Sequence, residues 1–126
     1  MSLRKKRPVN LNLLTIQLPV AGIMSIAHRL SGVMMFCLIP WVLFLLDLSL
    51  RGPEGFAQAK VLLHTGWLKL IWVAVVWALA HHFLAGLRYL LLDLDIGLEK
   101  PFYRYSAIAV LAGGGLAALL AVGVLL

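Results

Sequence analysis

Three long apolar stretches, each long enough to cross a lipid bilayer, constrain this sequence more than any other feature. They cover residues 22–48, 61–92 and 106–126, and the last of them contains no charged residue. About 20 apolar residues of α-helix cross the hydrocarbon core, and a helix suits lipid because it satisfies its backbone hydrogen bonds internally. The sequence therefore predicts an all-α fold, an integral membrane bundle of three transmembrane helices that forms a single domain over residues 1–126.

The composition excludes an ordinary soluble domain and most nucleic-acid-binding proteins. Hydrophobic residues make up 63% of the chain and charged residues only 13%, whereas soluble domains carry about 25% charged residues. The net charge of +6 is concentrated in the run Arg-Lys-Lys-Arg at residues 4–7. Ahead of apolar spans, such a run predicts a cytoplasmic N-terminus. We expect the lipid bilayer as a partner, no nucleic acid, and a second connection at residues 93–105 that is also cytoplasmic.

Ionisable residues inside the spans are the strongest indication of a functional site. His28 and Arg29 lie near the start of the first span, and His81, His82 and Arg88 lie toward the end of the second. Such residues are costly in a bilayer and usually serve a function. The topology with three crossings places both groups on the cytoplasmic side of the membrane.

Helical spacing separates the two adjacent histidines. At 100° per residue, His82 shares a face with Gly86 and Tyr89, whereas His81 shares a neighbouring face with Arg88. The two rings therefore cannot easily bind the same metal ion.

A haem is one group that this arrangement would suit. Its iron accepts an imidazole such as that of His82. Its propionates need cations nearer the aqueous edge, and His28, Arg29 and Arg88 could supply them. The alternative is structural, because a buried histidine often only bonds a neighbouring helix and an arginine can reach toward lipid headgroups.

Ser25 and Arg29 are candidates for a polar binding site because they lie four residues apart on one helical face. A hydroxyl and a guanidinium could bind a quinone carbonyl. A serine in a membrane helix can also bond only its own backbone, so the spacing alone leaves both interpretations open.

Three stretches resemble one family, the cytochrome b (C-type) membrane-anchor subunit of succinate dehydrogenase, respiratory complex II. They are residues 7–11 (RPVNL), 25–32 (SIAHRLSG) and 82–93 (HFLAGLRYLLLD). Their order and spacing agree with the family over essentially the whole chain.

The resemblance implies a role for each matching residue. His82 corresponds to the axial ligand of haem b and thus to the iron ligand, while His28 and Arg29 correspond to residues near the propionates. Ser25 and Arg29 correspond to ubiquinone-site residues. Tyr89 departs from the pattern, because many members carry histidine there.

The resemblance also implies partners. A sister anchor subunit completes the bundle and supplies the second axial ligand, and an iron–sulfur subunit and a flavoprotein subunit lie on the cytoplasmic side of a bacterial inner membrane. Electrons then pass from succinate to ubiquinone, and the chain is not catalytic on its own. The alternatives are the haem b anchor of a fumarate reductase and a non-redox membrane scaffold.

Overall fold

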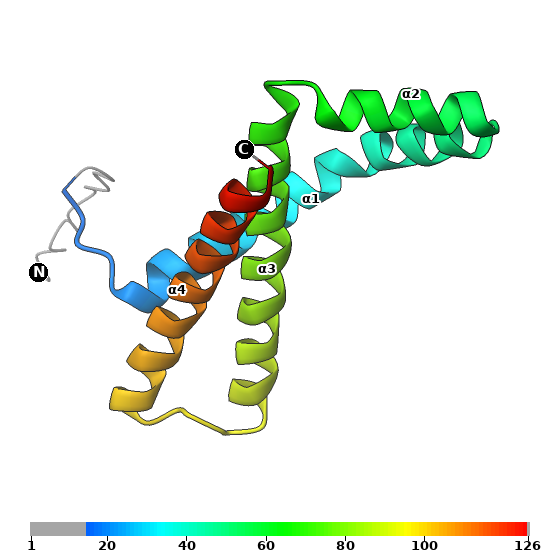
Figure 1. Cartoon of the computed structure of the whole chain (residues 1–126). Helices are drawn as coiled ribbons and strands as arrows, with labels where there is room; N and C mark the ends of the chain where they lie inside the picture. The colour runs from blue at the N-terminus through cyan, green and yellow to red at the C-terminus, as the bar shows by residue number, and fades with distance from the viewer. Residues whose placement is uncertain (1–14, 126) are drawn as a thin grey trace, which may run out of the picture.

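The computed structural model describes residues 15–125, which form four α-helices and, within that range, no strand (Figure 1). The helices are α1 (Val20–Leu50), α2 (Pro53–His64), α3 (Leu68–Asp93) and α4 (Lys100–Leu125). Three of them, α1, α3 and α4, are long and apolar enough to cross a membrane. The all-α bundle with three spans is confirmed, while the basic run at 4–7 and the stretch 7–11 lie outside the described residues.

The second span begins later than the sequence indicated. The expected span 61–92 is divided, because α2 ends at His64 and α3 begins at Leu68. Most of the connection expected between the first two spans, at residues 49–60, is instead helix α2. Gly52, with a φ of 103°, turns the chain, and Pro53 occupies the start of α2. Proline fits the first turn of a helix because its φ is already helical and its missing N–H has no partner there.

The three long helices meet toward the end of the molecule where α1 begins. In Figure 1, α3 and α4 form a hairpin, α1 crosses both of them, and α2 runs back along the distal half of α1. The α3–α4 connection contains two positive φ angles, 61° at Asp95 and 84° at Gly97. It therefore turns within six residues.

Small residues bring α3 and α4 close together. A Cβ at Gly113 would lie 2.6 Å from Leu84 Cδ1, and one at Gly114 would lie 3.1 Å from His81 Cβ. Gly115 and Gly123 face open space instead. Close approach at small residues is how helices associate in lipid, where burial of apolar surface gives little driving force.

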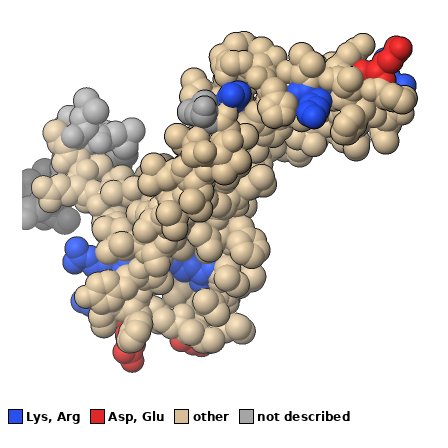
Figure 2. Space-filling view, viewed as in Figure 1, with Lys and Arg blue, Asp and Glu red and all other residues tan. Residues whose placement is uncertain are grey.

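The buried core lies between α1, α3 and α4 and is made of Met24, Ala85, Ala107 and Val110. Large apolar side chains are exposed elsewhere along the spans, as a lipid-facing surface requires. Figure 2 shows the charged side chains gathered mainly toward two ends of the molecule, with a broad uncharged surface between them. The chain is therefore a multi-pass membrane protein.

Candidate functional site

His82 of α3 meets α1 at His28 and Ser31. The rings of His82 and His28 stack with centroids 4.1 Å apart and an interplanar angle of 19°. His82 Nδ1 lies 3.1 Å from Ser31 Oγ and 3.2 Å from the main-chain oxygen of His28. The two histidine-bearing segments, 51 or more residues apart in sequence, therefore come together as the topology predicted.

The surroundings of Nδ1 determine where the His82 proton lies. The carbonyl oxygen of His28 can only accept a hydrogen bond. The Ser31 hydroxyl already donates to that same oxygen at 2.7 Å, so its own oxygen is available as an acceptor. Nδ1 therefore carries the hydrogen and donates it, and Nε2 carries a lone pair. Nε2 makes no hydrogen bond to a described residue, which leaves it able to bind a metal.

A glycine on α1 makes room for this ring. A Cβ at Gly32 would lie 3.1 Å from His82 Cε1 and 3.5 Å from Nδ1. The sequence placed Gly86 on the same face as His82, but a Cβ at Gly86 would meet nothing within 4 Å. The two glycines differ because Gly32 accommodates the ring itself, whereas Gly86 leaves open space one turn further along its helix. The signal for Gly32 was its place in the motif at 25–32.

His81 points into different surroundings, as the 100° spacing predicted. It is fully buried, its ring stacks on Trp77 at 5.4 Å, and it packs against Gly114 of α4. Neither ring nitrogen makes a hydrogen bond within residues 15–125, although the main chain of Met24 approaches the ring. His81 is thus enclosed by the bundle and not directed at the open side where His82 lies.

Arg88 is turned toward the first turns of α4. Only 4% exposed, it donates from Nε to Ser106 Oγ at 2.9 Å and from Nη2 to the Tyr103 carbonyl at 3.0 Å. Its guanidinium also lies 4.5 Å from the Tyr103 ring centroid. Only Nη1, buried and without a partner in the described part of the chain, remains to bind anything else.

The role of Tyr103 and Ser106 was missed by the sequence analysis. Both belong to α4 and lie 15 and 18 residues beyond Arg88. A buried guanidinium needs acceptors, but helical periodicity does not identify which residues of another helix supply them.

Ser25 and Arg29 lie one turn apart on α1, Ser25 half-buried and Arg29 exposed. Neither side chain bonds another described residue. The Tyr89 ring lies 5.4 Å from that of His28, which also stacks on the ring of His82. Polar groups of α1 and α3 thus gather around His28.

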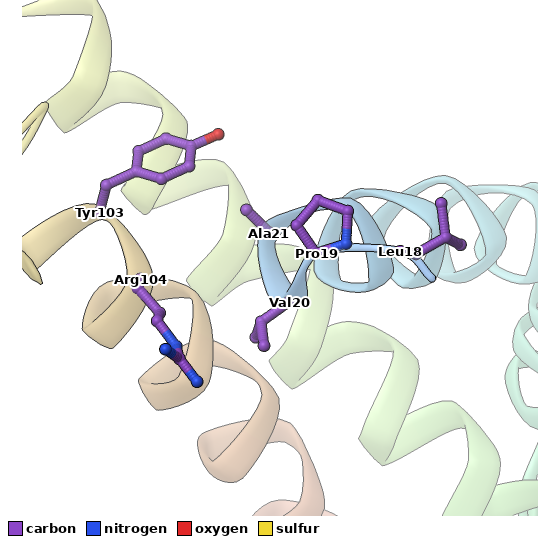
Figure 3. A pocket seen from close by; sticks show the side chains of 6 residues that line it. All are labelled: Leu18, Pro19, Val20, Ala21, Tyr103 and Arg104. Carbon is purple, nitrogen blue, oxygen red and sulfur yellow. The ribbon is translucent and has the colours of Figure 1, made fainter. Parts of the chain in front are cut away.

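A cavity of about 420 Å³ lies between the starts of α1 and α4 (Figure 3). Its lining consists of Leu18, Pro19, Val20, Ala21, Tyr103 and Arg104. None of the candidate site residues lines it, so it is separate from the surroundings of His82.

The described residues contain no group of three or more His, Cys, Asp or Glu side chains that could enclose a metal ion. A haem does not need such a group, because its macrocycle holds the iron and the protein adds only axial ligands. The lone pair on Nε2 of His82 fits that requirement.

Comparisons with known proteins identify the family. A family model described as "Succinate dehydrogenase/Fumarate reductase transmembrane subunit" matches residues 3–122. The chain is 39% identical to a succinate dehydrogenase cytochrome b556 subunit of Coxiella burnetii, covering 92% of this chain and 94% of the relative. It is 35% identical to a protein of the same name from Paracoccus denitrificans, covering 93% and 90%. The chain therefore belongs to the family of succinate dehydrogenase and fumarate reductase transmembrane subunits, as a cytochrome b membrane-anchor subunit.

Proposed function

We propose that this chain anchors a succinate dehydrogenase in the membrane and binds haem b through Nε2 of His82. The observation that carries the proposal is the pair of acceptors at Nδ1, Ser31 Oγ and the His28 carbonyl, which leave the lone pair on Nε2. Haem b, when bound, supplies a one-electron carrier. The exposed neighbour Phe83 and the open space at Gly86 support access from outside the chain.

The propionates of the haem would be held by cationic and polar groups around the same site. His28 stacks on His82 and has a buried Nε2 without a partner in the part of the chain described. Arg29 is exposed on the next position of α1. Arg88 contributes less than the sequence suggested, because two of its three nitrogens are bonded to α4. We assign the propionates mainly to His28 and Arg29, with Nη1 of Arg88 as a further donor.

A sister anchor subunit would supply the other ligand of the haem iron in this proposal. The surface of α3 next to His82 is exposed in the described part of the chain, where it carries large apolar residues such as Leu79 and Phe83. An iron–sulfur subunit and a flavoprotein subunit complete the enzyme and pass electrons from succinate to ubiquinone.

Ser25 and Arg29 bind the quinone head in this proposal. Both side chains lack a bonded partner among residues 15–125, and they lie one turn apart on the α1 segment that carries His28. Arg29 stabilises the negative charge that develops on a quinone oxygen during reduction, and the Ser25 hydroxyl adds a hydrogen bond that orients the ring.

The N-terminus and the α3–α4 connection face the cytoplasm of a bacterial inner membrane in this proposal. The basic run at 4–7 supports this orientation. Cysteine labelling of intact cells tests it, in a background where Cys37 is replaced by alanine. An impermeant reagent is expected to reach Glu54→Cys in α2 but to reach Glu99→Cys only after the membrane is opened. Labelling of Glu99→Cys in intact cells would reverse the orientation.

Purification of the chain from its native membrane tests the function as a whole. We expect a flavoprotein, an iron–sulfur protein and a second small membrane protein to copurify, together with a haem b spectrum and succinate-dependent quinone reduction. The family description also includes fumarate reductase, and a complex that chiefly oxidises quinol with fumarate would support that alternative. If neither soluble subunit copurifies and no haem is present, the result would support a non-redox membrane scaffold instead.

A further inference from the structure

We propose that Ser31 is a positioning residue that strengthens His82 as an iron ligand and thereby lowers the reduction potential of the bound haem. The inference rests on the proposed function, in which His82 is the axial ligand. It adds a role for a residue that does not itself contact the haem iron.

Ser31 is placed for this role by its burial and by its two bonds. It is fully buried, so water does not replace its hydroxyl. The hydroxyl hydrogen goes to the His28 carbonyl at 2.7 Å, and the oxygen faces His82 Nδ1 at 3.1 Å. The first bond is ordinary for a serine in a membrane helix. The second bond joins α1 to α3, and the hydrogen bonding of α1 by itself does not require it.

A comparison within the same helix separates the two bonds. Ser49 makes the same local bond, to the Leu46 carbonyl at 2.8 Å, near the other end of α1. No histidine of residues 15–125 bonds its oxygen. Ser49 is therefore a matched control that contains the local bond and lacks the contact with an imidazole.

The effect on His82 follows from how an imidazole distributes charge. An acceptor at Nδ1–H draws the proton outward and increases the electron density at Nε2, which makes the nitrogen a stronger donor to a metal. A stronger donor stabilises ferric iron more than ferrous iron, so it lowers the reduction potential. Ser31 supplies one of two acceptors, and the His28 carbonyl supplies the other. Loss of the hydroxyl should weaken the effect without abolishing it.

The test is a redox titration of the haem in the intact complex, in membranes, for Ser31→Ala. We expect the preference for ferric over ferrous iron to fall about tenfold, which corresponds to a rise of about 59 mV for one electron. Ser31→Thr keeps the hydroxyl and should keep the potential near that of the unmodified protein. Ser31→Cys should fall between them because a thiol is a weaker acceptor. Ser49→Ala should leave the potential unchanged.

The possible results separate this inference from the proposed function. An unchanged potential in Ser31→Ala, or in Ser31→Cys if the alanine variant fails to assemble, would overturn the role of Ser31 while leaving His82 as the ligand. A normal low-spin haem spectrum in His82→Ala would overturn the ligand assignment, and the role of Ser31 would fall with it. Equal shifts in Ser31→Ala and Ser49→Ala would reduce both to a general effect on α1.

Discussion

Replacing Gly32 by alanine tests how closely α1 confines the His82 ring. The added methyl group would lie 3.1 Å from Cε1, whereas ordinary contact begins at 3.4 Å, so the ring must withdraw by a few tenths of an ångström. Withdrawal by about 0.3 Å would lengthen the bonds from Nδ1, now 3.1 and 3.2 Å, to about 3.4–3.5 Å if it occurred along them. Both bonds would then be weak.

The expected change in overall stability is small, and the change at the site is larger. Overpacking costs about 1–3 kcal/mol, while alanine is favoured over glycine in a helix by about 1 kcal/mol. The net free energy of unfolding should therefore fall by about 0–2 kcal/mol. Displacement of the ligand and weakening of its outer hydrogen bonds should lower haem affinity about 10–100-fold.

Haem content per complex and the absorption spectrum, measured with thermal unfolding of the purified complex, check this prediction. Gly115→Ala is the matched control, because a Cβ there meets nothing within 4 Å. It should retain the haem and unfold at the same or a slightly higher temperature. If Gly32→Ala binds haem as tightly as Gly115→Ala does, the ring is not confined in the way described here.

Three further experiments test separate parts of the molecule. His82→Ala should abolish the low-spin haem spectrum, whereas His81→Ala should retain it and lower the unfolding temperature, because it leaves a cavity inside the bundle; the reverse pattern would exchange the two roles. Ser25→Ala should slow quinone reduction, by about 10²-fold if the serine acts as an oxyanion donor does, and should spare succinate oxidation by an artificial dye; unchanged quinone kinetics would make the serine structural. Arg88→Lys should lose at least one bond to α4 and destabilise the complex by about 1.5–3 kcal/mol, while Arg104→Lys, at an exposed position, should unfold as the unmodified protein does; equal unfolding temperatures would contradict the role of Arg88 between the helices.

Features that depend on one helix alone could be predicted from the sequence. The three spans follow from runs of apolar residues, and the separation of His81 from His82 follows from the 100° turn between them. The error at α2 also has a local cause. The spans 22–48 and 61–92 left residues 49–60 as a connection, although a proline such as Pro53 also starts helices. Apolar residues on both sides of Gly66 hid the break before α3.

Contacts between helices were predicted less completely. The meeting of His28 with His82 was expected from the number of crossings, which places their segments on the same side of the bundle. The orientation of Arg88 was not, because its acceptors lie on α4 and nothing in the period of α3 indicates them. Ser31 and Gly32 were quoted only as parts of a motif, since their contacts with His82 depend on how α1 crosses α3. The haem and quinone roles remain predictions.

The division of the site between α1 and α3 has a consequence for biogenesis. The α3–α4 hairpin is local in sequence, and its two helices approach each other directly at Gly113 and Gly114. Helices that are neighbours in sequence can pair early, whereas α1 must find a hairpin that is made after it. Until it docks, His82 lacks both of its acceptors. In the proposed function, a newly made chain therefore becomes competent to hold haem only after α1 has docked on the hairpin.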